Sequence, residues 1–429
     1  MYLTDFLFDG VKLSSLGFLV GSAVTSNNES ASAGSKLELQ TVVNHGNHLT
    51  GITNATYNEP ITVTFDIIKQ QCSDAVSFEI EDNEMASLMR WLNRKEWCKF
   101  KPLYNDLSFP NVYFMGTFTD ISAIIKGGYI VGLTLTLTTN APWGFMEYDN
   151  NTFTITQPNG SFTVYDMSDE LGNKYPEEVT ILNTTSAGDL TLTNNLNQRE
   201  TTIKNCKSLE VITLDCINKI ITSYDLNQLV PQLSSSSSAV IYNVTAGTAS
   251  DIWKVFDRSL STYGEFTGND VTRTGSKSAL IGYNFTNPVS AKYASICWGG
   301  TNNPNYKFTV QLQASTDGTN WVSLSEPKEI GQTSTPNFIK SNSDEKYKYW
   351  GIRYLSYNVQ SATVRYPQAH EIQFYSQGGD THTRLYNDFN YVYPMFTNTM
   401  DDSKNIFSST LPCLVDIKYR PIRKVGILV

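Results

Sequence analysis

The chain has 429 residues, which at roughly 150 residues per domain is enough for about three domains with separate cores. Hydrophobic residues make up 40% of the chain, which excludes a disordered protein, and charged residues reach only 17%. The net charge of −9 argues against binding to nucleic acid or to an anionic membrane, because both need a basic surface. Ser, Thr, Asn and Gly must supply much of the polar surface, and this composition favours strands and turns over long helices.

Targeting and membrane signals are missing from the sequence. The segment Met1–Gly10 carries two aspartates and no basic region followed by an apolar run, so we expect no signal peptide. No stretch approaches about 18 consecutive apolar residues, so we expect no membrane insertion. The cysteines have no C-x-x-C spacing, and we expect reduced, mostly buried thiols, with Cys206 and Cys216 the only pair near enough to be considered for a disulfide. These features fit a protein made in a cytoplasm.

The first 140 residues are predicted to form strands and one helix. Apolar and polar residues alternate over Ile61–Ile67 and Val131–Leu137, the period-two pattern of half-buried strands. Between them, a single apolar stripe predicts a helix over 83–94, capped by Asp82 or Asn83; the stripe consists of Met85, Leu88, Met89 and Leu92.

A long exposed arm is expected between Val24 and Ala55, where the chain is rich in Ser, Asn, Gly and Thr. Within it, Leu37-Glu38-Leu39 begins an alternating strand. His45 and His48 lie in this arm, but no Cys or carboxylate nearby completes a ligand set, so we expect no metal there.

A second all-β region follows the Ala141-Pro142-Trp143-Gly144 interruption. Short strands at close spacing, separated by Asn, Gly and Asp turns, predict a β-sandwich. The expected strands are 152–156, 162–165, 179–182, 190–193, 201–204, 211–214 and 220–222.

The chain then enters a separate all-β unit. The five serines 234–238 and the pair Gly378-Gly379 are expected to be connectors at its two ends. The inferred organisation is an N-terminal domain (1–140), a discontinuous sandwich (141–233 and 380–429) and an inserted domain (239–377).

Residues 1–230 and 380–429 resemble the distal tail proteins of long-tailed, non-contractile bacteriophages (siphophages). The resemblance implies an N-terminal belt domain that forms a six-membered ring and a galectin-like β-sandwich facing outward. It also implies docking between the tail tube protein and tip proteins such as a tail-associated lysin or a receptor-binding protein. The segments that carry it are Phe8-Asp9-Gly10, Met85–Leu92 with Trp91, Ala141–Gly144, Asp388–Tyr391 with Tyr393-Pro394, Leu411–Cys413 and Tyr419–Gly426.

The insert resembles the discoidin jelly roll, which is shared with many carbohydrate-binding modules. The matching segments are Ala249-Ser250, Val255–Asp257, Thr262, Ser315–Gly318 with Trp321, and Ala369–Ile372. In carbohydrate-binding relatives a structural calcium ion is often held here, and Asp257, Thr262 and Glu371 offer hard oxygen ligands at compatible positions. The usual Asp-Gly-Asn/Asp turn is Asp257-Arg258-Ser259 in this chain, which removes one ligand.

A saccharide site needs an aromatic face for the sugar C–H groups and planar polar groups for the hydroxyls. Such residues fall in the expected loops of the insert, and each has the alternative of an ordinary loop residue. The candidates are Tyr263, Phe266, Asn302, Asn303, Tyr306, Tyr357, Arg365 and Tyr366.

No catalytic motif supports an enzyme. The sequence has no G-x-S-x-G elbow, no phosphate-binding glycine motif and few histidines. We therefore expect a non-catalytic, mainly β virion protein of the tail tip, assembled in the host cytoplasm, whose insert binds a host cell-wall saccharide. The alternatives are a cell-surface or secreted lectin, and a tail protein whose insert is only a protein-contact spacer.

Overall fold

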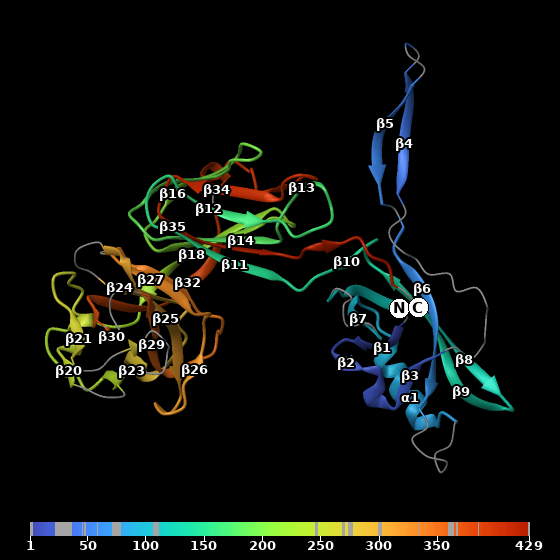
Figure 1. Cartoon of the computed structure of the whole chain (residues 1–429), viewed down its shortest axis with the longest axis horizontal. Coiled ribbons are helices and arrows are strands. Elements are labelled where there is room, and N and C mark those ends of the chain that lie inside the picture. Colours follow the sequence, from blue (N-terminus) through green and yellow to red (C-terminus); the bar gives the residue numbers. More distant parts are fainter. Residues whose placement is uncertain are drawn as a thin grey trace.

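A computed structural model shows a chain built mainly of β-strands, with one α-helix in the part that the structure describes (Figure 1). No helix among those residues is long and apolar enough to cross a membrane. The described residues are 3–21, 37–44, 46, 49–57, 59–70, 79–105, 111–244, 248–267, 271–272, 278–298, 303–333, 335–358, 364–365, 368–384 and 386–427.

The N-terminal part of the chain, named the belt domain after the resemblance to distal tail proteins, is a seven-stranded sheet against which the helix packs. The strands predicted at 61–67 and 131–137 are confirmed as two neighbouring antiparallel strands of this sheet. The strand order is β2-β1-β7-β8-β9-β6-β3, with β1 (Leu3–Phe8), β2 (Val11–Lys12), β3 (Phe18–Val20), β6 (Thr62–Lys69), β7 (Cys98–Tyr104), β8 (Phe114–Lys126) and β9 (Tyr129–Thr139). A 3-10 turn, η1 (Leu13–Leu16), joins β2 to β3.

Aromatic rings fill the core of the belt domain. Phe6 stacks on Trp91 with ring centroids 5.7 Å apart and planes within 8° of parallel. Phe8 meets Phe118 edge-on at 5.0 Å, and its carbonyl oxygen accepts a 2.9 Å hydrogen bond from Trp91 Nε1. The indole N–H therefore has a partner inside an apolar core, as buried tryptophans require.

The helix α1 (Asp82–Leu92) confirms the helix predicted over 83–94, to within two residues at each end. Its start differs from the prediction, because the residue at the N-cap is Glu81 rather than either of the two residues that follow it. The Glu81 backbone N–H donates to Glu84 Oε2 at 2.9 Å. A carboxylate three residues into the helix thus satisfies a donor that the first turn leaves open.

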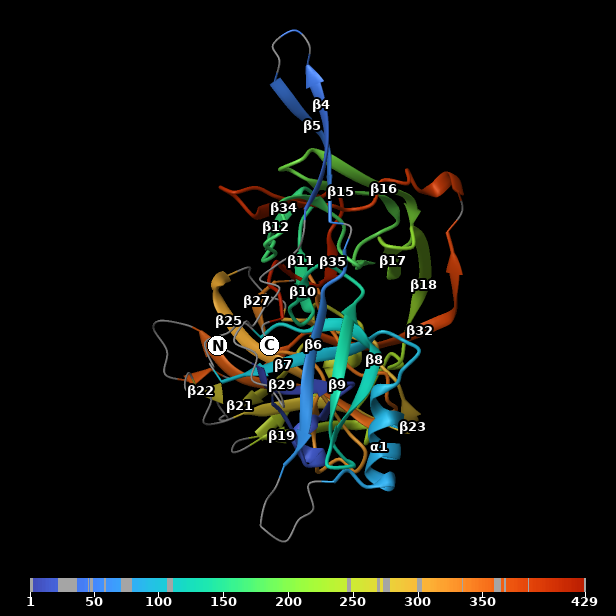
Figure 2. The ribbon, with the colours of Figure 1, turned by 90° about the vertical axis from the view of Figure 1, so that its right-hand side faces the viewer.

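The expected arm is confirmed where the structure describes it. Strands β4 (Glu38–Asn44) and β5 (Leu49–Thr56) pair with each other and, among the described residues, with no other strand. Both views show this hairpin projecting from the belt domain on the side away from α1 (Figures 1 and 2). His45 and His48 lie outside the described residues.

The central part is a β-sandwich whose strands come from both sides of the insert. β35 pairs with β11 and β14, and β34 pairs with β12 and β15, so early and late segments of the chain share both sheets. The seven predicted short strands are confirmed. They are β11 (Asp149–Ile155), β12 (Gly160–Tyr165), β14 (Glu178–Asn183), β15 (Gly188–Asn194), β16 (Arg199–Cys206), β17 (Glu210–Asp215) and β18 (Ile220–Gln228); the returning strands are β34 (Lys404–Ser409) and β35 (Cys413–Tyr419).

The inserted part is a jelly roll. Trp350 and Trp298 lie in its core with 0% and 4% exposure. One sheet has the order β19-β23-β29-β25-β26. β27 also pairs with β25, along the edge of β25 opposite to β29. The bounds are β19 (Val240–Val244), β23 (Ala279–Val289), β25 (Asn303–Ser315), β26 (Val322–Ser323), β27 (Lys328–Gln332) and β29 (Tyr347–Asn358). The second face comprises β24 (Tyr293–Cys297), β28 (Asn337–Lys340) and the start of β32 (Glu371–Thr383).

Strand β32 joins the jelly roll to the sandwich without a break. It pairs with β24 of the jelly roll and then with β18 of the sandwich, so one eight-stranded sheet runs through both parts. The expected connector Gly378-Gly379 is therefore wrong, because both glycines lie inside this strand. Gly379 has φ +78, and the register between β18 and β32 shifts nearby. The glycines thus accommodate an irregularity in a continuous ladder. Ser234–Ser238 lie outside any helix or strand.

A shared apolar cluster fixes the insert to the sandwich. Side chains of both parts are buried together in it, and a bulky buried contact of this kind opposes independent motion of two domains. The cluster consists of Leu182, Val211, Leu226 and Leu414 from the sandwich, with Tyr293, Phe338 and Tyr375 from the jelly roll.

The end of the chain fastens the sandwich to the belt domain. β36 (Ile422–Arg423) pairs with β10 (Gly144–Phe145), and Ile427 is fully buried in the belt core. Three basic residues of this segment form ion pairs with acids of the sandwich: Arg420 with Glu177, Arg423 with Asp169, and Lys424 with Glu170.

Candidate functional site

An exposed tyrosine and a buried histidine meet at one edge of the jelly roll. Tyr263 is 45% exposed, and its ring centroid lies 5.4 Å from that of His370, with the planes 40° apart. His370 is only 8% exposed, and its Nδ1 has no hydrogen-bond partner. Burial lowers the pKa of His370, so the imidazole is neutral at neutral pH and can both donate and accept. The exposed Tyr263 ring offers an aromatic face of the kind that a sugar takes, and the buried His370 ring packs against it.

Next to this pair, Glu371 lies in an environment unfavourable to its charge. Burial raises its pKa to about 7, with a smaller contribution from the charge of Asp257. Its Oε1 accepts a 2.7 Å hydrogen bond from Gln373 Nε2, whereas its Oε2 is buried without a partner. A buried carboxylate oxygen without a hydrogen-bond partner requires a proton, a water molecule or a cation.

The other two expected calcium ligands lie together. Thr262 Oγ1 donates to Asp257 Oδ2 at 2.6 Å, and Asp257 Oδ1 accepts from the Ser259 backbone N–H at 2.8 Å. These hydroxyl and carboxylate oxygens, together with the unpartnered Glu371 oxygen, fit a hard cation. In the described part of the chain no three His, Cys, Asp or Glu side chains gather as a metal group, so a cation here would also need hydroxyl or main-chain oxygens.

Of the remaining sequence candidates, Phe266 lies on β21 (Gly264–Thr267), whose pairing with β31 (Gln368–Ala369) brings its backbone to this edge. No described contact brings the others there. Tyr357 is 4% exposed and packs edge-on against Phe308 in the jelly-roll core, so its ring is not at a surface. Phe266, Asn303, Tyr306 and Arg365 lie in strands, but their side chains are not described; Asn302 and Tyr366 are outside the described residues.

Two residues of this edge were missed by the reasoning from sequence. His370 and Gln373 flank Glu371 on β31–β32, where β31 spans Gln368–Ala369. Their place in or beside the segment 369–372, which matches the discoidin pattern, was the available signal. A single histidine in a strand gives no indication of which loop residue its ring will meet.

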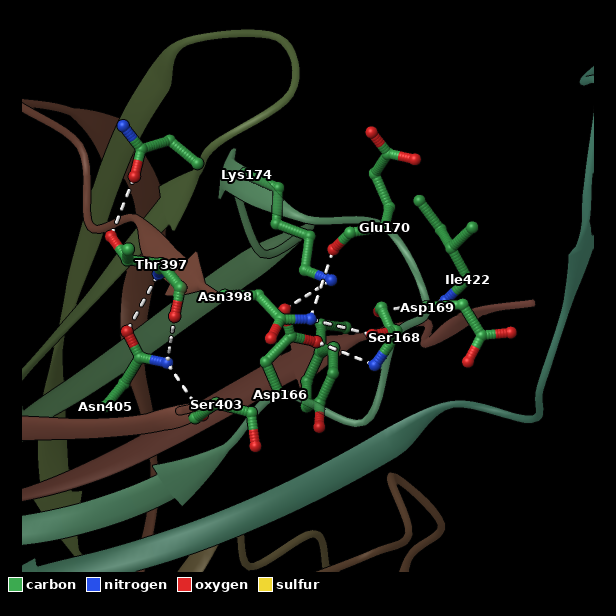
Figure 3. A network of polar contacts seen from close by, with 12 residues as sticks. Asp166, Ser168, Asp169, Glu170, Lys174, Thr397, Asn398, Ser403, Asn405 and Ile422 are labelled. Atoms are coloured by element: carbon green, nitrogen blue, oxygen red, sulfur yellow. Dashed lines mark hydrogen bonds and ion pairs between the residues drawn. The ribbon is translucent and has the colours of Figure 1, made fainter. Parts of the chain in front are cut away.

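The sandwich carries a separate polar cavity of about 390 Å³. Beside it lies a network of polar contacts, in which Asn398 Nδ2 donates to the carbonyl oxygen of Ser168 at 2.7 Å, and Ser168 Oγ accepts from the Ile422 N–H at 2.9 Å (Figure 3). Asp166 is fully buried and forms an ion pair with Lys174, whose pKa burial lowers. The chain itself thus satisfies these groups, and the network holds the returning C-terminal strand in place.

The belt domain has an apolar groove of about 430 Å³ between η1 and α1. Val11 and Leu16 on its rim are 38% and 41% exposed. The one carboxylate on the groove, Glu84, forms a 2.8 Å ion pair with Lys69. The full lining is Val11, Leu16, Phe18, Asn83, Glu84, Ser87, Leu88 and Trp91.

Three solved structures are similar to parts of the chain. The Dit protein of phage SPP1, described as a paradigm of the hub adsorption apparatus in phages that infect Gram-positive bacteria, is 15% identical with a TM-score of 0.38; the match covers 52% of this chain and 82% of that one. The family 32 module of AlyQ in complex with 4,5-unsaturated mannuronic acid is 12% identical with a TM-score of 0.25, covering 31% and 91%. The family 32 module of Clostridium perfringens NanJ, in complex with galactose, is 13% identical with a TM-score of 0.25, covering 35% and 99%.

Two family models match the sequence. One, described as a phage tail protein N-terminal domain, matches residues 1–141; the other, described as a phage tail C-terminal domain, matches residues 143–233 and 303–419. A search of curated proteins found no match. Since the two models together span well over half of the chain, the chain belongs to this family of phage tail proteins and is a structural component of the virion.

Proposed function

We propose that copies of this chain form a ring, of six subunits as the distal tail resemblance implies, between the tail tube and the tip proteins. The inserted jelly roll binds a saccharide of the host cell surface during adsorption. The observation that carries the saccharide proposal is the exposed Tyr263 ring, held in place by its contact with the buried His370.

A ring gives weak sugar contacts a common scaffold. Saccharide sites are shallow, and they compete with water for the hydroxyl groups of the sugar, so one module binds weakly. Several modules on one ring make the second and later contacts intramolecular, which raises the total affinity without any new contact. The shared apolar cluster and the continuous β32 support this scheme, since modules held at fixed positions lose little freedom on binding.

Tyr263→Ala is expected to reduce binding of the full chain to host cell walls by about tenfold or more, because it removes the stacking face. Tyr242→Ala is the matched control, since this tyrosine of the same domain is 52% exposed. Glycan-array and cell-wall pull-down measurements on both variants provide the readout. Equal binding of wild type and Tyr263→Ala would remove this edge from consideration. A wild-type chain that binds no glycan would favour a spacer role for the insert.

We also propose that Asp257, Thr262 and Glu371 hold a structural calcium ion. Binding to the folded state alone adds about 2.7 kcal/mol when free Ca²⁺ exceeds Kd by about 100-fold. We expect Ca²⁺ to raise the unfolding temperature of the jelly roll in calorimetry, and Glu371→Gln to abolish the shift. Glu345→Gln is the control, because Glu345 is an exposed acid of the same domain whose carboxylate accepts from the Tyr347 hydroxyl. An identical shift in the Glu371 variant would contradict the assignment.

A further inference from the structure

We propose that the β4–β5 arm of one copy docks into the apolar groove between η1 and α1 of a neighbouring copy. The inference rests on the proposed ring and names the surfaces that build it. Arm and groove belong to the same domain, and neither has an apolar partner within its own chain among the described residues.

The arm exposes several large apolar side chains. Ile52 is 63% exposed, Val42 54% and Val43 49%. Two-stranded hairpins are marginally stable in water, and their free edges and exposed apolar side chains mark surfaces that other elements cover. Val43 pairs with Thr50 and Thr41 pairs with Ile52, so Val43 and Ile52 share one face of the ribbon.

The charges at both surfaces suit a dry contact. Between Leu37 and Tyr57 the sole charged side chain is Glu38, at the base of the arm, although the chain as a whole carries −9. In the groove, Lys69 already neutralises Glu84. Docking therefore buries no unpaired charge, which would otherwise oppose the association of two copies of an acidic protein.

The placement of the two surfaces favours a second copy over a contact within one chain. Both views put the arm at one end of the belt domain and α1, beside the groove, at the other (Figures 1 and 2). The seven residues of β4 span about 23 Å, long enough to reach beyond the body of the domain. A projection at one end and a groove at the other make a heterologous contact, which repeats from copy to copy and can close into a ring.

The base of the arm is held in a defined direction. The Tyr57 ring meets Trp143 edge-on at 5.6 Å, and the Tyr57 hydroxyl accepts a 2.8 Å hydrogen bond from Lys424 Nζ. The arm is thus anchored where the belt domain, the sandwich and the C-terminal segment meet. A neighbour that binds it is positioned relative to all three.

Disulfide trapping between two differently substituted chains tests the proposal. Val43→Cys chains are mixed with Leu16→Cys chains and oxidised, and linked species are resolved on non-reducing gels. A disulfide needs Cα atoms within about 7 Å, so only direct contact gives a strong product. We expect a linked dimer in the mixture and a ladder of linked copies when both substitutions are in one chain. The five described native cysteines are buried. Oxidising each variant on its own measures any background from the sixth native cysteine.

The control is Val322→Cys mixed with Leu16→Cys, since Val322 of the insert is 51% exposed. Light scattering on the same samples separates the possible failures. Assembled copies that give no Val43–Leu16 link would overturn the docking proposal and leave the ring standing. A chain that stays monomeric at all concentrations would overturn both. A link as strong with Val322→Cys as with Val43→Cys would show random collision and also overturn the docking proposal.

Discussion

Arg384→Ala is expected to destabilise the sandwich by about 3–5 kcal/mol, because it leaves a buried carboxylate without its partner. Arg384 and Glu210 form an ion pair with side chains only 6% and 1% exposed. Arg384 also donates to the carbonyl oxygen of Lys204, and the second Glu210 oxygen accepts from the Lys207 N–H at 2.8 Å. The pair fastens the chain to the sandwich immediately after β32 leaves the insert. Calorimetry of the full chain measures the loss.

The double variant Arg384→Met with Glu210→Leu separates charge burial from lost packing. Both side chains keep much of their volume and neither leaves a buried charge, so this variant should be far closer to wild type than Arg384→Ala. Arg94→Ala serves as the surface control: Arg94 pairs with Asp9, both are about 36–49% exposed, and such pairs contribute roughly 0–1 kcal/mol. A double variant as unstable as the single one would mean that the buried pair is itself net stabilising.

The fold was predictable wherever burial on one face imposes a period on the sequence. Alternation located β6, β9 and the seven sandwich strands, and the apolar stripe located α1. The resemblance of the sequence to phage tail proteins is confirmed by the two family models. Partition of the chain at the expected domain boundaries stays a prediction, although the sandwich is completed by strands from both sides of the insert.

Errors arose where a local irregularity changes the phase of a strand. Trp350, Ile352 and Tyr354 alternate toward the core, but the register of β29 against β25 shifts after Tyr354. That bulge turns Tyr357 inward, whereas the sequence suggested a loop residue. The same limit applies to Gly378-Gly379, where two glycines suggested a connector and a continuing ladder holds them. A bulge depends on a partner strand that the local sequence does not reveal.

The candidate site was only partly predictable, because it depends on contacts between distant segments. The spacing of Asp257 and Thr262 made their hydrogen bond foreseeable, since both lie in one short turn. The Tyr263–His370 contact joins β31–β32 to a loop more than a hundred residues earlier, and no periodicity encodes that distance. The burial of Glu371, including its unpartnered Oε2, likewise depends on tertiary packing alone.

The insert and the sandwich meet at a lysine whose charge is poorly accommodated. Lys328 of β27 donates to Thr154 Oγ1 of the sandwich at 2.7 Å and to the Phe338 carbonyl oxygen at 2.6 Å. No carboxylate among the described residues pairs with it, and burial lowers its pKa to about 8. This junction should therefore respond to mildly alkaline pH.

We expect the free energy of unfolding of wild type, taken relative to that of Lys328→Met at the same pH, to rise between about pH 8 and pH 9.5. An unfolded lysine has a pKa near 10.4, so in this window Lys328 binds more protons in the unfolded chain than in the folded one, and through this group raising the pH favours folding. The whole shift corresponds to at most about 3 kcal/mol. The buried thiols of Cys206, Cys216 and Cys413 act in the opposite direction, as do the buried Tyr293 and Tyr224, because burial raises the pKa of each of these groups. They do so equally in both proteins, so calorimetry at intervals up to pH 9.5 compares the two pH profiles.

Lys340→Met is the matched control for Lys328→Met, because Lys340 lies at the same junction but has a carboxylate partner, Asp416, which is 15% exposed. Removing Lys340 leaves that carboxylate unpaired, so this variant should be less stable than wild type and should keep the pH profile of wild type. Lys328→Met, in contrast, should be at least as stable as wild type at pH 7.5. Parallel pH profiles for wild type and Lys328→Met would contradict the prediction and show that Lys328 is solvated in solution.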